Sequence, residues 1–305
     1  MKGSIRIGIS GWRYAPWRKV FYPAGLPQRR ELEYASREFG SIELNGSFYS
    51  LQTPERYASW YADTPPGFQF SVKAPRYITH IRRLREVEKP LANFLASGLF
   101  ELREKLGPIL WQFPPSFRYQ PELLERFFRL LPRDTLAARE VARGREPRMK
   151  GRCSLEVDRK RPLRHAIEVR HDSFRDEGFI AQLRRHRVAL VVADTAGRWP
   201  HLEDLTSDFV YIRLHGAEEL YASGYTPQAL AYWGARIRKW RHGGQPARGP
   251  RVSSRPPRPR TARDVYCYFD NDRKVKAPVD ARQLEQWLLA RGEEVARGDA
   301  GAADS

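Results

Sequence analysis

Short segments of this chain alternate apolar and polar residues, and the polar residues gather at the C-terminal end of each segment. The pattern is clearest in YIRLHG at residues 211–216 and recurs in AIEVRH at 166–171 and SIELNG at 41–46. Because side chains along a β-strand point alternately to opposite faces, each segment carries one apolar face and one face that ends in charge. We therefore predict strands whose charged ends meet if the strands close into a ring.

Helical signatures separate the predicted strands. Thr226 followed by Pro227 pairs a threonine N-cap with proline at the first helical position, and Thr53 followed by Pro54 repeats this signal. Eight strands separated by helices favour a parallel sheet of the α/β class, and eight is the number that closes a single (β/α)8 TIM barrel. The predicted strands cover residues 5–10, 41–45, 68–73, 109–113, 166–170, 189–194, 209–215 and 265–270.

An open, doubly wound sheet is the alternative architecture. Such sheets bind nucleotides through a glycine-rich loop after the first strand, but SGWRYAPW at residues 10–17 has neither the GxGxxG nor the P-loop spacing. The same absence leaves the chain without a nicotinamide or flavin signature. The barrel is therefore the preferred prediction, with residues 1–290 as one domain and 291–305 as a disordered tail.

Positive charge is concentrated in two segments of the chain. The net charge is +18, and residues 136–164 carry ten Lys or Arg against four acids while residues 241–263 carry seven Arg and no acid. We predict a basic insertion at 136–164 and a flexible, Pro- and Arg-rich insertion at 241–263. Clustered cations bind phosphate backbones, so nucleic acid is one predicted partner.

Cysteine content and hydropathy bear on the cellular location. The chain has only two cysteines, Cys153 and Cys267, and no stretch approaches the length of apolar residues that a membrane span needs. It also begins without an apolar leader. We expect a cytoplasmic protein without a disulfide framework or a membrane partner.

Candidate site residues follow from the barrel hypothesis, because TIM-barrel enzymes place their active sites at the C-terminal ends of the strands. A desolvated lysine serves as a base or nucleophile, paired arginines bind carboxylate or phosphate, and carboxylates or histidine transfer protons. The alternative is a buried polar plug in which these charges only neutralise one another. The predicted catalytic residues are Lys73, Glu168, Asp194 and His215; the predicted binding residues are Glu43, Asn45, Tyr77, His80, Gln112, Arg170, His171, Arg213, Asp270 and Trp12.

Several of these side chains are also of the types that bind divalent metals. A lysine and two arginines among them disfavour a bound cation, and the chain has no HxH, HExxH or paired-cysteine spacing. We predict no metal ligands and leave the cofactor open. Aromatic residues in the loops after the strands favour a nucleotide, nucleic-acid or sugar-like ligand.

Seven motifs occur in order between residue 5 and about residue 272: IGISGWRYAPWRKVFYPAGLP, IELNGSFYSLQTPE, FSVKAPRYITH, LGPILWQFPPSF, AIEVRHDSF, YIRLHG and YFDND. With them the chain resembles the DUF72 or YecE-like family over nearly its whole length. The resemblance implies a TIM barrel similar to the endonuclease IV and xylose isomerase type, and a role with nucleic acid, but no catalytic residues. After YFDND the family usually has an Asn-Ala pair where this chain has Asp280 and Ala281, so the final loop is expected to differ.

Three functions are consistent with these patterns. The first is an enzyme, a hydrolase or lyase, that acts on a phosphate-bearing or sugar-like anion at the mouth of the barrel. The second is a nucleic-acid-binding protein without catalysis that uses its basic segments. The third is a non-enzymatic binder of a small anion.

Overall fold

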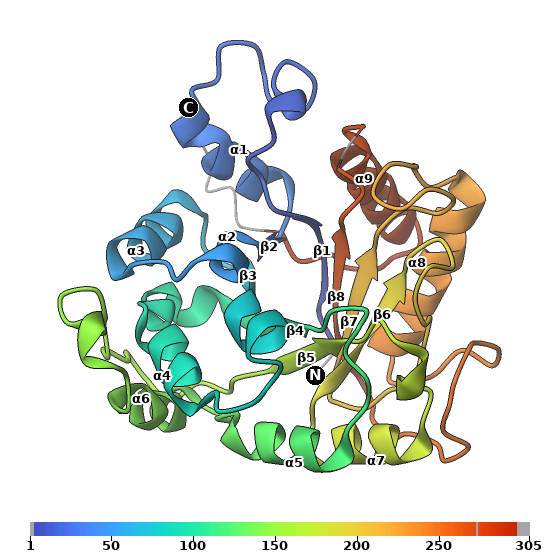
Figure 1. The fold of residues 1–305 in the computed structure, drawn as a ribbon. Helices are drawn as coiled ribbons and strands as arrows, with labels where there is room; N and C mark the ends of the chain where they lie inside the picture. Colours follow the sequence, from blue (N-terminus) through green and yellow to red (C-terminus); the bar gives the residue numbers. More distant parts are fainter. Residues whose placement is uncertain (1–2, 273, 298–305) are drawn as a thin grey trace.

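The strands form a closed parallel barrel in a computed structural model that describes residues 3–272 and 274–297 (Figure 1). Each strand pairs with its neighbours in sequence, and β8 pairs with β1 to close the ring. The predicted (β/α)8 TIM barrel is confirmed. Its strands are β1 (Ile5–Ser10), β2 (Ser41–Leu44), β3 (Gln69–Lys73), β4 (Leu106–Gln112), β5 (His165–Glu168), β6 (Ala189–Asp194), β7 (Phe209–Leu214) and β8 (Asp264–Phe269).

Helices surround the barrel in the order in which they follow the strands (Figure 1). The predicted start at Thr226 is confirmed, since its hydroxyl accepts a hydrogen bond from the Ala229 amide at 3.2 Å. The helices are α1 (Glu31–Glu38), α2 (Gly46–Tyr49), α3 (Pro54–Asp63), α4 (Glu88–Ala96), α5 (Pro121–Leu130), α6 (Thr135–Arg143), α7 (Glu177–Arg185), α8 (Pro227–Arg241) and α9 (Lys276–Leu289), with short helical turns η1 (Ala15–Trp17), η2 (Gln28–Arg30), η3 (Tyr77–Ile81), η4 (Leu99–Lys105), η5 (Pro147–Met149) and η6 (Asp172–Phe174). In the described part of the chain, none of these helices is both long and apolar enough to cross a bilayer.

The lumen of the barrel is filled by side chains. The outer strand faces carry isoleucine, leucine and valine that pack against the helices, whereas the inner faces carry small residues and tyrosines. The Tyr211 hydroxyl lies 2.6 Å from Ser71 Oγ, and the Tyr268 hydroxyl lies 2.7 Å from Ser41 Oγ. This hydroxyl layer gives the buried polar atoms partners and forms a floor beneath the polar strand ends.

The two basic segments are attached to the body of the protein. Residues 136–164 include most of α6, whose buried Ala138 and Ala142 lie on a helix packed against α4. Residues 241–263 connect α8 to β8 and therefore lie at the N-terminal rim of the barrel. The Asp204 carboxylate accepts hydrogen bonds from the Val252 and Ser253 amides at 2.8 and 2.9 Å, which fixes part of this connection.

Residues 291–297, which we expected to belong to a disordered tail, instead pack beside β1. The Ala296 amide donates to the Ile5 carbonyl at 2.8 Å, and Val295 forms a parallel bridge with Ile5. Glu293 is 5% exposed and forms an ion pair with buried Arg241. The prediction was wrong here because these long-range contacts leave no local periodic pattern; residues 298–305 lie outside the described residues.

Substitution of Glu293 with alanine will therefore destabilise the protein by about 3 kcal/mol, because the Arg241 guanidinium, itself 4% exposed, is left without its buried counter-ion. The neighbouring Glu294→Ala is the matched control, since the Glu294 side chain is 80% exposed and contributes little. Urea denaturation measures both free energies of unfolding. Equal midpoints for the two variants would show that the 291–297 segment does not stabilise the barrel.

Candidate functional site

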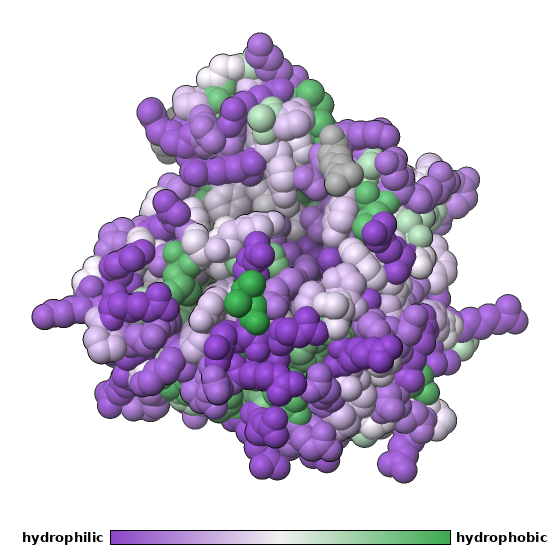
Figure 2. Space-filling model, in the orientation of Figure 1, coloured by the Kyte–Doolittle hydropathy of each residue, from purple (hydrophilic) through white to green (hydrophobic). Residues whose placement is uncertain are grey.

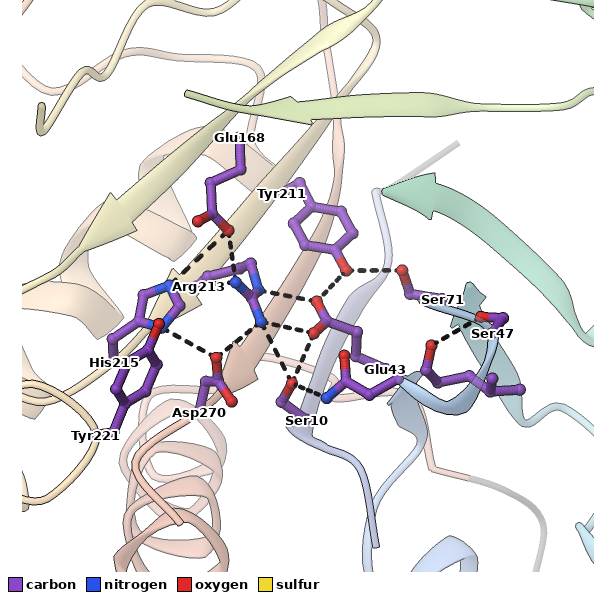
Figure 3. Close-up of polar contacts among 12 residues, drawn as sticks. Ser10, Glu43, Ser47, Ser71, Glu168, Tyr211, Arg213, His215, Tyr221 and Asp270 are labelled. Atoms are coloured by element: carbon purple, nitrogen blue, oxygen red, sulfur yellow. Dashed lines mark hydrogen bonds and ion pairs between the residues drawn. The ribbon is translucent and has the colours of Figure 1, made fainter. Parts of the chain in front are cut away.

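Arg213, on β7, lies at the centre of the polar strand ends and is fully buried (Figure 3). Its Nε and Nη2 donate to the two oxygens of Glu43 at 3.0 and 2.8 Å. Nη1 donates to Glu168 Oε2 at 2.5 Å, and Nη2 donates to Asp270 Oδ2 at 2.8 Å. One guanidinium thus joins carboxylates from β2, from β5 and from the residue after β8.

The remaining contacts of Arg213 complete its coordination. Nη1 lies 3.3 Å from His215 Nε2, and Nη2 lies 3.4 Å from Ser10 Oγ. All five N–H groups of the guanidinium therefore face acceptors within the protein. Our expectation that Arg213 binds a substrate anion is wrong for this geometry, because its donors are already used; for this residue the alternative of a buried ionic network is the correct one.

The carboxylates around Arg213 are held in their ionised form. Burial opposes ionisation of Glu168, but the charges of Arg170 and Arg213 outweigh it and hold the pKa of this carboxyl well below its usual range. For Asp270, burial is likewise outweighed by Arg213 and by contact with His215, so its pKa is also lowered. Neither carboxylate is suited to take up a proton from a substrate near neutral pH.

His215 is buried beneath the mouth rather than exposed to it. Burial, and then the charge of Arg213, lower the pKa of the imidazole, so the ring is neutral at pH 7. Nδ1 lies 3.0 Å from Asp270 Oδ2 while Nε2 faces Arg213, which places the proton on Nδ1. The rings of Trp199 and Tyr221 lie edge-on to the imidazole. His215 thus orients Asp270 and has no free nitrogen for a substrate.

Lys73, the last residue of β3, differs from its charged neighbours. The residue is 8% exposed, and Nζ lies 4.4 Å from the centre of the Phe48 ring. Within residues 3–272 and 274–297 no hydrogen-bond acceptor or carboxylate pairs with this ammonium group. Burial, and then the charge of Arg213, lower its pKa to about 8. The His80 ring also contacts Phe48, edge to face at 5.1 Å, and burial together with the Lys73 charge lowers the pKa of this histidine to about 4.

Arg170 forms the outer layer of the cluster. Its Nε donates to Glu168 Oε1 at 2.6 Å, Nη2 donates to the Tyr221 hydroxyl at 3.3 Å, and its guanidinium carbon lies 3.8 Å from the centre of the Trp199 ring. These contacts fix the plane of the guanidinium. Among the described residues Nη1 has no acceptor, so this nitrogen is available to a ligand.

Two predicted site residues lie away from the cluster. Alternation along β6 places Ala193 in the inner layer, so Asp194 faces outward, where its charge, after burial, raises the pKa of Tyr225. The predicted lumen position of Asp194 is therefore wrong. His171 is turned away from the lumen because it follows Arg170 by one residue; its Nδ1 accepts from the Ser173 amide at 3.0 Å and caps η6.

The other predicted residues surround the mouth at different depths. Asn45 donates to Ser10 Oγ at 2.9 Å, and Gln112 is 5% exposed beside Glu168 in the strand register. Tyr77 is 49% exposed on η3 at the rim. Trp12 is buried in the outer layer against α3 and does not contact the charges.

A hollow of about 1020 Å³ lies beside the charge cluster, between the β1–α1 loop, α2 and α3. Trp12, Tyr14 and Trp60 supply its aromatic wall, and Asn45 stands between it and the cluster. Figure 2 shows a separate depression near the centre of the view, over the strand ends, with hydrophilic side chains around it. The hollow is large enough for a small organic molecule.

The donor set does not favour a metal ion. In the described ranges no three His, Cys, Asp or Glu side chains are arranged to hold one. The Arg213 guanidinium occupies the space between Glu43, Glu168 and Asp270 where a cation would have to sit.

Comparison with known families agrees with this architecture. The family model described as "Protein of unknown function DUF72" matches residues 6–303. The chain belongs to the DUF72 family. The UPF0759 protein YunF of Bacillus subtilis is 32% identical over 123 residues, 39% of this chain and 43% of that protein. The UPF0759 protein YecE of Escherichia coli is 29% identical over 113 residues, 37% of this chain and 39% of that protein. The matched stretches thus span less than half the length of these relatives.

Solved DUF72 structures share the fold. A DUF72 family protein of Thermotoga maritima superposes with a TM-score of 0.69 at 23% identity, over 94% of this chain and 99% of that one. A DUF72 family protein of Enterococcus faecalis gives a TM-score of 0.68 at 18% identity, over 98% of this chain and 100% of that one. Both comparisons support the TIM barrel alone.

The DUF72 motifs do not mark every residue of the site. Three aromatic residues that cover Lys73, Arg170 and His215 were not among the predicted site residues: Phe48, Trp199 and Tyr221. The sequence gives one signal for these residues, which is that each is aromatic and lies near the end of a strand. Residues outside the strands lack the strand periodicity that would predict the direction of their side chains.

The final loop of this DUF72 protein, where the family pattern changes, is built around Asp280. The Asp280 carboxylate accepts from Asn271 Nδ2 at 2.7 Å and from the Tyr225 amide at 3.1 Å. It therefore ties the end of β8 to the start of α8.

Proposed function

We propose that this protein is an enzyme of the lyase class that binds a small anionic carbonyl compound at the C-terminal mouth of the barrel and uses Lys73 as its nucleophile. The observation that carries this proposal is the Lys73 ammonium group, which is buried without a counter-ion or acceptor in the described structure while the neighbouring charges are paired. A pKa of about 8 leaves about a quarter of the amine neutral at pH 7.5.

The surroundings of Lys73 favour this class over a hydrolase. A carboxylate-based hydrolase needs one acid and one free base, but Glu43, Glu168 and Asp270 all accept from Arg213. Arg170 Nη1 is available for the carboxylate or phosphate of the substrate.

The proposed reaction begins with attack of the neutral Lys73 amine on the carbonyl carbon. The carbon–oxygen double bond becomes a carbon–nitrogen double bond, and the carbonyl oxygen leaves as water with the two protons of the amine nitrogen. A proton from solvent then converts the imine to an iminium, which draws electrons from the neighbouring carbon–carbon or carbon–hydrogen bond; this is the basis of lysine-dependent lyase chemistry.

Glyoxylate, a small anionic aldehyde, tests this proposal when it is added with sodium cyanoborohydride, which reduces an imine to a stable amine. Peptide mass spectrometry will find carboxymethylation at Lys73 at least tenfold faster than at the exposed lysines. The rate will rise with pH and be half-maximal near pH 8. Inorganic phosphate will slow the labelling by competing for Arg170.

Lys105 is the matched control within the same chain. It is 4% exposed, but its ammonium group donates to the Tyr61 and Thr64 carbonyls, so it will remain unlabelled. Labelling of exposed lysines with none at Lys73 would refute the nucleophile. A rise in the thermal denaturation temperature with inorganic phosphate, together with no labelling at Lys73, would identify a non-enzymatic anion binder instead.

A further inference from the structure

A second hollow lies at the opposite, N-terminal rim of the barrel. Its volume is about 490 Å³, and it is bounded by the residues that precede β5, β6 and β7. Its charged lining consists of Arg133, Arg164, Arg185 and Arg187 against a single acid, Asp208. The lining of this hollow therefore carries a net positive charge, and the hollow lies at the opposite end of the barrel from the site proposed above.

Only part of this positive charge is neutralised within the protein. Arg164 pairs with Asp264 at 2.6 Å, and Arg185 pairs with Glu125 at 3.3 Å. The guanidinium groups of Arg133 and Arg187 have no carboxylate or hydrogen-bond acceptor in the described parts of the chain. Burial, and then the charge of Arg187, lower the pKa of Arg133, which indicates that the two like charges share this hollow. A bound anion would relieve their repulsion.

The backbone conformation at Arg187 is a second unusual feature of this hollow. Arg187 has φ of 49°, in the left-handed region that favours glycine, and it follows the end of α7 where the Val188 amide returns to the Leu183 carbonyl. Glycine would fit this turn without strain, but this chain has an arginine here, whose side chain lines the hollow.

The unpaired charges continue beyond this hollow. A neighbouring hollow shares Arg187 and is lined by Arg258 and Arg260 from the 241–263 connection. Arg263 donates to the Gly243 carbonyl at 2.5 Å, and Arg184 donates to the Arg255 carbonyl at 3.0 Å, so the backbone that carries these arginines is fixed. We call Arg133, Arg187, Arg258 and Arg260 the rim band.

We propose that the rim band binds the phosphodiester backbone of a nucleic acid without reading its base sequence. An extended row of guanidinium groups matches a chain of phosphates better than a single phosphate, and each arginine can donate two hydrogen bonds to one phosphate. Neither hollow is lined by an aromatic side chain other than His186, so stacking platforms for bases are lacking there.

A membrane surface is the less suitable partner. The exposed large apolar side chains of the described chain do not line either hollow, so the rim has nothing to insert between lipids. They are Val20, Tyr49, Tyr77, Ile81, Tyr232, Val279 and Leu289.

Fluorescence anisotropy with a labelled single-stranded DNA of mixed sequence, about 20 nucleotides long, tests the proposal. The test variant carries Arg133→Gln, Arg187→Gln, Arg258→Gln and Arg260→Gln. We expect its affinity at 100 mM NaCl to fall at least tenfold. The slope of log affinity against log salt concentration will decrease in magnitude by about 3, since each phosphate contact to a single strand contributes about 0.7.

The control variant removes the same charge from exposed residues on the mouth side, through Lys19→Gln, Arg29→Gln, Arg76→Gln and Arg198→Gln. It should bind within threefold of the unsubstituted protein. If the fourfold rim variant does not fold, Arg258→Gln with Arg260→Gln alone should give about half the change in slope. Equal losses in both variants, a loss confined to the mouth-side variant, or binding to anionic vesicles without binding to DNA would overturn the proposal.

Discussion

Replacement of Arg213 with methionine will destabilise the protein by about 3 to 5 kcal/mol at pH 7.5, or prevent its folding, because three buried carboxylates lose the guanidinium that neutralises them. Methionine fills similar space, so the loss reports charge rather than a cavity. The free energy of unfolding in urea measures it. Arg282→Met is the matched control: its ion pair with Glu38 is partly exposed, and we expect less than about 1 kcal/mol.

The same substitution will change how stability depends on pH. In the unsubstituted protein the pKa values of Glu168 and Asp270 are lower when folded than when unfolded. Their ionisation therefore stabilises the fold above pH about 4, and this contribution is lost as the pH falls through the folded values. Without Arg213 the buried carboxyls bind protons more readily, so the stability gap between the two proteins will narrow towards pH 4. A gap that stays constant or widens in acid would contradict the assigned charge network.

Replacement of Lys73 with methionine will raise the free energy of unfolding by up to about 3 kcal/mol at pH 7, whereas replacement of Arg213 lowers it. The folded pKa of about 8 lies below the ordinary value of 10.5, and each unit corresponds to about 1.4 kcal/mol. At pH 7 the folded protein therefore carries a buried charge that methionine does not, and methionine retains the contact with Phe48.

The stabilising effect of Lys73→Met will disappear as the pH rises. Between pH 8 and 10.5 the unfolded chain holds a proton that folded Lys73 has released, so the unsubstituted protein gains stability relative to the variant across this window. Thermal denaturation at pH 7, 8.5 and 10 measures the difference. Lys105→Met should instead destabilise the protein, because it leaves the Tyr61 and Thr64 carbonyls without their donor. Destabilisation by Lys73→Met at every pH would show that the Lys73 ammonium has a stabilising partner.

Strand periodicity in the sequence was sufficient to predict the barrel and most of the inner residues. Alternation within β7 placed Arg213 and His215 on the lumen side, and the same rule placed Glu43 and Glu168. The prediction is wrong at Asp194: this residue is polar and ends its strand, but Ala189, Val191 and Ala193 occupy the inner positions of β6, so Asp194 faces outward.

The partners of each charge were not predictable from the sequence. Periodicity predicts the direction of a side chain but not its distance from side chains on the other strands of the barrel. It therefore could not distinguish an arginine that is free to bind a ligand from one whose donors are all used by carboxylates. The structure shows that Arg213 is of the second kind, with Glu43, Glu168 and Asp270 as its partners. For the same reason the net charge did not show that Arg133, outside both predicted basic segments, joins Arg258 at the rim.

The hydroxyl layer in the lumen also prevents small molecules from passing through the barrel. Tyr211 with Ser71 and Tyr268 with Ser41 close the interior between its two ends. A molecule at the mouth therefore has no route out through the far end. For the proposed reaction this means that substrate and product share one opening, and that a ligand bound to the rim band would leave this opening unchanged.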